Sequence, residues 1–120
     1  DILNKLLREI IELEICGEKQ LYFMQNIDGL IKIGISNNPD IRLKTLKNQL
    51  NEDIVIIKTL PFANYEKELH KKYHCYNAYY KGYTEWFTPY PDLLEFINIV
   101  NEENFEKEFK KIKLKYAKEV

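Results

Sequence analysis

The sequence predicts a single small α+β domain, in which a central antiparallel sheet of three strands is flanked by helices and further helices are added at both ends. Two short β-prone runs surround a turn at 27–29, a continuous β-branched run follows at 53–60, and helical apolar spacing fills much of the remainder. A chain of 120 residues with 45% hydrophobic content is large enough for one core and too short for two.

Three segments are predicted along the chain. Residues 1–17 carry apolar side chains at intervals of three and four, with charged residues between them, which is typical of an amphipathic helix. Residues 18–100 form the main domain, and residues 101–120 form a charged amphipathic helix. No apolar run reaches the roughly 20 residues that a membrane-spanning helix needs, so we expect a soluble, intracellular protein without a membrane partner.

The first two strands, 21–25 and 30–35, are expected to form a hairpin. A three-residue loop with Gly29 in the left-handed conformation pairs Leu21 with Ile35 and collects the apolar residues on one face of the sheet. The same register brings three residues together on the opposite face, where chemistry could occur: Tyr22, Lys32 and Gly34.

The remaining elements follow from local signals. Residues 37–39 combine a side-chain cap with a proline in the first turn, so a helix is expected to begin there. The run 53–60 is β-branched and continuous enough for a central strand, which Pro61 ends. A helix over about 64–76 and a short helix after Pro91 complete the domain.

This order of hairpin, helix, strand and helix resembles the core of the GIY-YIG nuclease family, in the phage and viral branch with a Lys-Ile-Gly second motif. The similarity covers roughly residues 20–87. The matching segments, in order, are Gln20-Leu21-Tyr22, Lys32-Ile33-Gly34, Arg42 in an Arg-Leu pair, Glu66-Lys-Glu-Leu-His70 as E-x-x-L-H, and Glu85-Trp86-Phe87 as E-W-F.

The resemblance implies an endonuclease that hydrolyses DNA phosphodiester bonds with one divalent metal, Mg²⁺ or Mn²⁺. Tyr22 would act as the general base, and the ammonium of Lys32 would favour its phenolate. Arg42 would hold the scissile phosphate through paired hydrogen bonds. Glu66 would be the metal ligand, since a single carboxylate suffices for a hard ion that keeps several waters. His70, one helical turn after Glu66, could position water or phosphate.

Further contacts with nucleic acid are expected outside this group. Tyr73 and Asn77 continue the stripe of Glu66 and His70, and residues 110–118 contain five lysines and no acid. The predicted contact residues are Lys44, Tyr73, Asn77, Lys110 and Lys111. Four tyrosines near Lys81 could stack on bases or pack against their own domain: Tyr76, Tyr79, Tyr80 and Tyr83.

Other interpretations of these residues stay open. Glu66, His70 and His74 form a stripe that could bind zinc, although Lys71 disfavours a metal nearby. The E-W-F segment could be a structural lock in which Trp86 and the phenylalanine that follows fill the core.

The charge of the chain motivates alternatives to catalysis. A formal net charge of −1 is not the strongly basic balance of a protein that holds DNA by phosphate neutralisation alone. A partner domain missing from this chain could supply DNA affinity, or the chain could be a catalytically inactive GIY-YIG-like module that binds nucleic acid or protein. Pairing through the apolar face of residues 2–13 could also form a homodimer.

Overall fold

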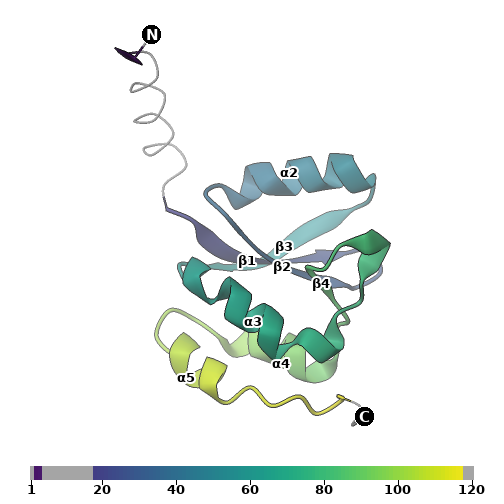
Figure 1. Ribbon diagram of the computed structural model, residues 1–120, viewed down its shortest axis with the longest axis vertical. Coiled ribbons are helices and arrows are strands. Elements are labelled where there is room, and N and C mark those ends of the chain that lie inside the picture. The colour runs from purple at the N-terminus through teal and green to yellow at the C-terminus, as the bar shows by residue number, and fades with distance from the viewer. Residues whose placement is uncertain (1, 4–17, 118–120) are drawn as a thin grey trace.

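One antiparallel sheet lies between helices in the part of the chain that this computed structural model describes, residues 2–3 and 18–117 (Figure 1). The strands are β1 (Gln20–Asn26), β2 (Ile31–Ser36), β3 (Ile54–Leu60) and β4 (Trp86–Phe87). The helices are α2 (Pro39–Leu50), α3 (Glu66–Lys72), α4 (Pro91–Ile99) and α5 (Phe105–Lys110), with short 3-10 turns η1 (Ala63–Tyr65), η2 (His74–Tyr76) and η3 (Tyr80–Gly82). Most of the helix predicted over 1–17 falls outside the described residues.

The α+β class is confirmed, but the sheet has four strands in the order β3-β1-β2-β4 where three were predicted. The additional strand, β4, is only two residues long and pairs with the start of β2, Phe87 opposite Ile31 and Trp86 opposite Lys32. A run of two residues is too short to show the alternation that predicts a strand from sequence. β4 is recognised only by its pairing with β2.

The prediction that 53–60 is a central strand is wrong, since β3 lies at the edge of the sheet and β1 pairs with both β2 and β3. Val55 and Ile57 are exposed, so the continuous apolar run is not buried on both faces. A β-branched composition favours a strand but does not distinguish an edge from a centre.

The predicted hairpin register is confirmed. Leu21 pairs with Ile35 and Tyr22 pairs with Gly34. Gly29 has a φ of 88°, and its N–H donates to the carbonyl of Asn26 at 3.0 Å, which closes the turn. Glycine adopts this left-handed geometry at no steric cost, so the loop length and the register are set together.

Helices cover both faces of the sheet and enclose two clusters of buried side chains (Figure 1). On one face Leu46 of α2 packs in a cluster with Tyr22, Met24, Ile54 and Trp86. On the other face α3, α4 and α5 cover a larger cluster that includes Leu21, Phe23, Ile33, Leu69 and Phe105. Alternate residues of β1 and β2 therefore enter different clusters, as the alternation of side chains along a strand requires.

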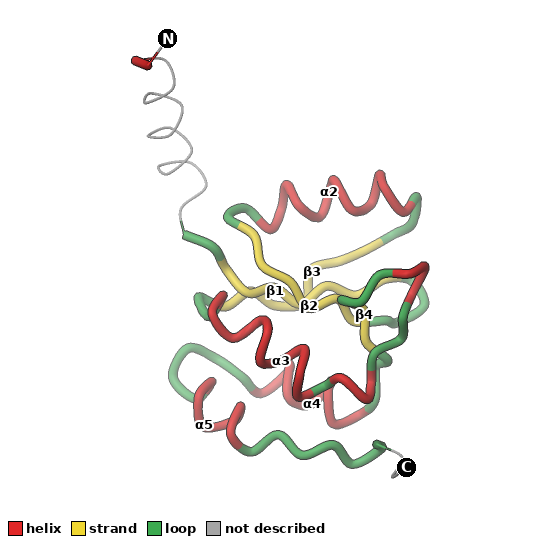
Figure 2. Tube along the Cα trace, in the orientation of Figure 1, coloured by secondary structure: helices red, strands yellow, loops and turns green. Residues whose placement is uncertain are grey.

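Two predicted helices are shorter than expected. The helix predicted over 64–76 is α3 alone, with the 3-10 turns η1 and η2 at its ends. Of the helix predicted over 101–120, only α5 is present in the described residues up to 117. After α5 the chain continues as a loop across the bottom of the molecule in Figure 2. There the ring of Tyr116 stacks on Tyr90, with centroids 5.3 Å apart. No helix in the described part of the chain is long and apolar enough to cross a membrane.

Candidate active site around the Lys-Ile-Gly strand

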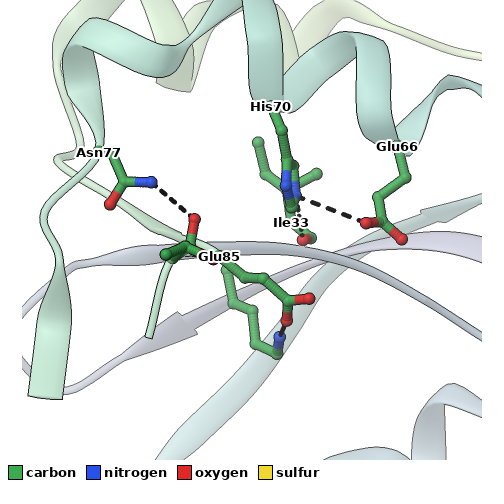
Figure 3. Close-up of polar contacts among 7 residues, drawn as sticks. Ile33, Glu66, His70, Asn77 and Glu85 are labelled. Atoms are coloured by element: carbon green, nitrogen blue, oxygen red, sulfur yellow. Dashed lines mark hydrogen bonds and ion pairs between the residues drawn. The ribbon is translucent and has the colours of Figure 1, made fainter. Parts of the chain in front are cut away.

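The candidate site lies along β2, where the short β4 stops pairing with it. The N–H of Ile33 donates to the carbonyl of Glu85 at 3.1 Å, just before β4 begins. The Nε2 atom of His70 lies 2.8 Å from the carbonyl oxygen of Ile33, as Figure 3 shows. Residues from two later segments of the chain therefore converge on the Lys-Ile-Gly motif in the middle of β2.

Tyr22 does not stand on an open face, as the sequence had suggested. Its side chain is 1% exposed, because α2 lies over this face and buries the ring against Leu46, Ile54 and Trp86. In the described part of the chain no fully buried side-chain oxygen lacks a hydrogen-bond partner, and no hydrogen bond uses the Tyr22 hydroxyl. The small exposed part of Tyr22 must therefore include Oη.

The Tyr22 hydroxyl lies against the backbone of Gly34. A β-carbon built at Gly34 would be 2.4 Å from Oη and 2.5 Å from Cζ of Tyr22. Contacts this short cannot form, so glycine at this position makes room for the phenol. The packing of the Tyr22 ring against Gly34 therefore explains why the Lys-Ile-Gly motif has glycine at this position.

Lys32 lies beside Tyr22 on the same face, with Nζ 5.8 Å from the centroid of the phenol ring. Its side chain is 3% exposed, and its ammonium forms an ion pair with the carboxylate of Glu85, whose side chain is 44% exposed (Figure 3). A buried ammonium needs such a partner, because burying an unpaired charge is strongly unfavourable. Glu85 was missed as a site residue, although its place directly before the strand residue that pairs with Lys32 could have indicated it.

Glu66 and His70 face each other one helical turn apart on α3. Oε1 of Glu66 lies 3.8 Å from Nε2 of His70, and both side chains are largely but not fully buried. A carbonyl oxygen can only accept a hydrogen bond, so Nε2 of His70 donates to Ile33. This nitrogen is therefore engaged with β2, and the histidine ties α3 to the candidate site.

The donor set suits a metal ion held by one carboxylate and not a zinc site. His74 is exposed and belongs to η2, beyond the end of α3. Among the described residues, no three or more His, Cys, Asp or Glu side chains are grouped to hold a metal. The zinc interpretation of Glu66, His70 and His74 is therefore wrong for this arrangement, whereas Glu66 alone fits an ion that keeps most of its waters.

Arg42 lies on the first turns of α2, next to the end of β2. It lines an open hollow with Lys19, Ser36, Asn37, Asn38, Ile41 and Thr45. Its guanidinium forms no ion pair with another described residue. The planar donor group is therefore available to an anion from solution.

Two of the predicted nucleic-acid contacts are corrected by the structure. Tyr73 is 2% exposed, and burial, together with the charge of Asp92, raises its pKa. Asn77 uses its amide within the chain, because Nδ2 donates to the carbonyl of Thr84 at 2.6 Å and Oδ1 accepts from the N–H of Tyr79 at 2.8 Å. The helical stripe that suggested both contacts ends with α3 at Lys72, so these residues follow a different path.

The three lysines predicted to contact nucleic acid are exposed. Lys44 lies on α2, while Lys110 and Lys111 form surface ion pairs within α5 and at its end, with Glu106 at 3.4 Å and Glu108 at 3.6 Å. Because surface pairs of this kind contribute little, the ammonium groups can exchange partners.

Comparison with known proteins gives one family. The model of the T5orf172 domain matches residues 15–113, which include all the elements of the sheet and the candidate site. No curated protein and no solved structure matches the chain. The T5orf172 domain is associated with phages and is often grouped with nuclease-like folds. A match over most of its length shows that the chain belongs to the T5orf172 domain family.

Proposed function

We propose that this protein is a metal-dependent endonuclease that hydrolyses DNA phosphodiester bonds by the GIY-YIG type of chemistry. The observation that carries the proposal is the convergence on β2. The hydroxyl of Tyr22 lies against Gly34, Lys32 lies next to its ring, and His70 ties the helix of Glu66 to the intervening Ile33. The grouping of the family with nuclease-like folds supports the same conclusion.

In this proposal the chain prepares a proton acceptor beside a cation. As the phenolate, Tyr22 accepts a proton from the attacking water through Oη, which belongs to the small exposed part of its side chain. The ammonium of Lys32 stabilises negative charge on the phenol by Coulomb attraction. Glu85 forms an ion pair with the ammonium of Lys32. The partly exposed carboxylate of Glu85 therefore has to move away before the full positive charge of Lys32 can act on the phenol.

Arg42 and Glu66 hold the two charged parts of the substrate complex. The guanidinium of Arg42, without an ion pair in the described chain, makes paired hydrogen bonds to the phosphate oxygens. The carboxylate of Glu66 holds Mg²⁺ or Mn²⁺, which supplies charge stabilisation for the leaving oxygen when it is bound. His70 keeps α3, and with it Glu66, at a fixed distance from β2.

Nicking of supercoiled plasmid tests the proposal. The natural chain should convert the plasmid to the open circle with Mg²⁺ or Mn²⁺ and not with EDTA, and Arg42→Ala and Glu66→Gln should lower the rate by about a hundredfold or more. Glu68→Gln is the matched control for Glu66, since Glu68 lies on the same helix with a largely exposed side chain. Lys47→Ala, an exposed residue of α2, serves for Arg42. Equal residual nicking in all variants indicates a contaminant and contradicts the proposal.

The enclosed ring of Tyr22 and the Lys32–Glu85 ion pair support a second candidate function, a non-catalytic module that binds nucleic acid. Such a module retains DNA without cleavage, and its affinity falls steeply as salt rises because phosphate contacts release counterions. Filter binding at several salt concentrations, with nicking measured on the same samples, separates the two functions. Salt-independent retention argues against the binding module.

A further inference from the structure

The loop of residues 77–84, here named the tyrosine loop, begins and ends at the candidate site. At its start, the N–H of Ala78 donates to the carbonyl of Trp86 at 2.9 Å. At its end, Thr84 accepts the hydrogen bond from the Asn77 amide and is followed by Glu85, the partner of Lys32. Figure 3 shows Asn77, Glu85 and His70 in one close-up around Ile33 of β2. Both ends of the loop are therefore held next to the strand on which the proposed reaction depends.

The middle of the tyrosine loop is anchored to the body of the protein by Tyr80 and Lys81. Both side chains bind the same carboxylate oxygen of Glu52, Tyr80 Oη at 2.8 Å and Lys81 Nζ at 3.1 Å. The ring of Tyr80 also packs edge-on against Trp86, with centroids 5.7 Å apart. These contacts hold the loop in place without its other two tyrosines.

Tyr79 and Tyr83 take no part in this anchoring. They are 59% and 51% exposed, and neither ring forms a ring contact or a hydrogen bond with another described side chain. Tyr79 and Lys81 have φ values of 49° and 50°, a left-handed geometry that bulky residues rarely adopt. Since strained backbone persists only where the surroundings hold it, the anchored loop fixes the position in which Tyr79 is exposed.

The chemistry of the tyrosine loop suits unpaired nucleobases. It presents two exposed aromatic faces beside the half-exposed side chain of Lys81, whose ammonium pairs with Glu52, and the loop itself contains no acidic residue. Aromatic side chains beside a basic group bind single-stranded nucleic acid by stacking on successive bases, with little dependence on sequence. In a duplex the bases stack on each other and their faces are not accessible, so such a loop discriminates between paired and unpaired DNA.

We propose that Tyr79 and Tyr83 stack on unpaired bases of DNA next to the scissile phosphate, so that the substrate contains a single-stranded segment. This inference rests on the proposed nuclease function and adds its substrate class. It assigns the two tyrosines to specificity and leaves the chemistry with the residues on β2 and α3.

Fluorescence anisotropy of a labelled oligonucleotide tests the inference. Single-stranded DNA and the duplex of the same sequence are compared in EDTA, so that binding is measured without cleavage. Replacing each tyrosine with alanine should weaken single-strand binding by about tenfold for each ring, while duplex binding changes by less than about twofold. The matched control is Tyr79→Phe with Tyr83→Phe, which keeps both stacking faces and should bind the single strand within about twofold of the natural chain.

Several outcomes overturn the inference. The first is an equal loss of affinity for the single strand and for the duplex in the alanine variants. The second is a loss of single-strand affinity in the phenylalanine variant as large as in the alanine variants. The third is no measurable binding of the natural chain to the single strand. Cleavage of the plasmid and of the labelled single strand with Mg²⁺ keeps this failure separate from that of the nuclease proposal. Tyrosine-dependent strand binding without cleavage of either DNA defeats the nuclease proposal alone, whereas cleavage with binding indifferent to Tyr79 and Tyr83 defeats the present inference alone.

Discussion

The hydroxyl of Tyr22 occupies the space that a side chain at Gly34 would need. A β-carbon there would lie 2.4 Å from Oη, 2.5 Å from Cζ and 3.1 Å from Cε1 of the tyrosine. The two residues are opposite each other in the β1–β2 ladder, so the contact follows from the register of the hairpin. The first and second motifs of the candidate site thus depend on each other through packing.

Gly34→Ala is therefore expected to destabilise the protein by about 1–3 kcal/mol, because a buried ring has to move. Removing the hydroxyl alone would not relieve the overlap, since Cζ is almost as close, so the partner substitution is Tyr22→Leu. Urea unfolding of both single variants and the double variant forms a double-mutant cycle. Gly34→Ala should cost less in the leucine background, and equal costs in both backgrounds would show that the overlap is relieved elsewhere.

The parts of the fold that follow local rules could be predicted from the sequence. The hairpin register follows from alternation together with Gly29, and the start of α2 from Asn38, whose side chain accepts a hydrogen bond from the N–H of Ile41 at 3.3 Å. Both features depend on neighbours within a few residues. The path of the chain after α3 could not be predicted, because Tyr73 leaves the helix to pack in the core and this depends on distant residues.

The sequence pointed to several residues of the candidate site but not to the contacts between them. The resemblance to a nuclease family drew attention to Lys32, His70 and Glu66, whereas the ion pair of Lys32 with Glu85 spans 53 positions of the chain. No local pattern encodes such a pair. The burial of Tyr22 under α2 was missed for the same reason, since the face that a helix covers is decided by packing.

The Lys32–Glu85 pair predicts an asymmetry between two substitutions. Glu85→Gln leaves the buried ammonium of Lys32 without its counter-charge and should destabilise the protein by about 1–3 kcal/mol, a range limited by the partial exposure of Glu85. Lys32→Met removes the buried charge and keeps an unbranched chain, so it should cost less. Denaturant midpoints measure both.

The exposed Lys71–Glu68 pair of α3 provides the control for this comparison. Its charged atoms are 3.6 Å apart and both side chains are more than half exposed, so Glu68→Gln should change the stability by less than about 0.5 kcal/mol. A larger cost for Lys32→Met than for Glu85→Gln would show that the lysine stabilises the fold by its own contacts.

Glu52 links acid stability to the tyrosine loop. Burial alone would raise the pKa of Glu52, but hydrogen bonds from Tyr80, Lys81 and Asn26 outweigh it and hold the pKa below its ordinary value of 4.5. A carboxylate with a depressed pKa in the folded state stabilises the protein above its unfolded pKa, and this contribution is lost as the pH falls through the folded value. Glu52→Gln should therefore lower stability at pH 7 by about 1–3 kcal/mol and flatten the decline below about pH 4.5.

Thermal unfolding between pH 7 and pH 3 measures this effect of Glu52. Glu68→Gln again serves as the control, because its surface pair is screened by solvent. An unchanged acid slope in Glu52→Gln would mean that other carboxylates set the acid stability.

Tyr76 predicts the opposite dependence, at alkaline pH. Burial, and then its hydrogen bond to Asp92 at 2.7 Å, raise the pKa of Tyr76 from 10.0 to about 12. The folded state thus keeps the proton that the unfolded chain loses near pH 10, so this contribution to stability is complete below pH 10 and is lost as the pH rises to about 12. Tyr76→Phe removes the titrating group. The difference in free energy of unfolding between the natural chain and this variant should therefore shrink from pH 10 to about 12.

Asp92→Asn distinguishes the two causes of the raised Tyr76 pKa. The tyrosine stays buried in this variant but loses the anionic acceptor, so the alkaline loss of stability should become smaller without disappearing. Since the N–H of Tyr116 donates to Oη of Tyr76 at 3.0 Å, deprotonation also changes the site where the C-terminal segment is attached. Chemical unfolding at several alkaline pH values gives the free energies for all three chains. Parallel curves for the natural chain and Tyr76→Phe would contradict the assignment of this alkaline transition to Tyr76.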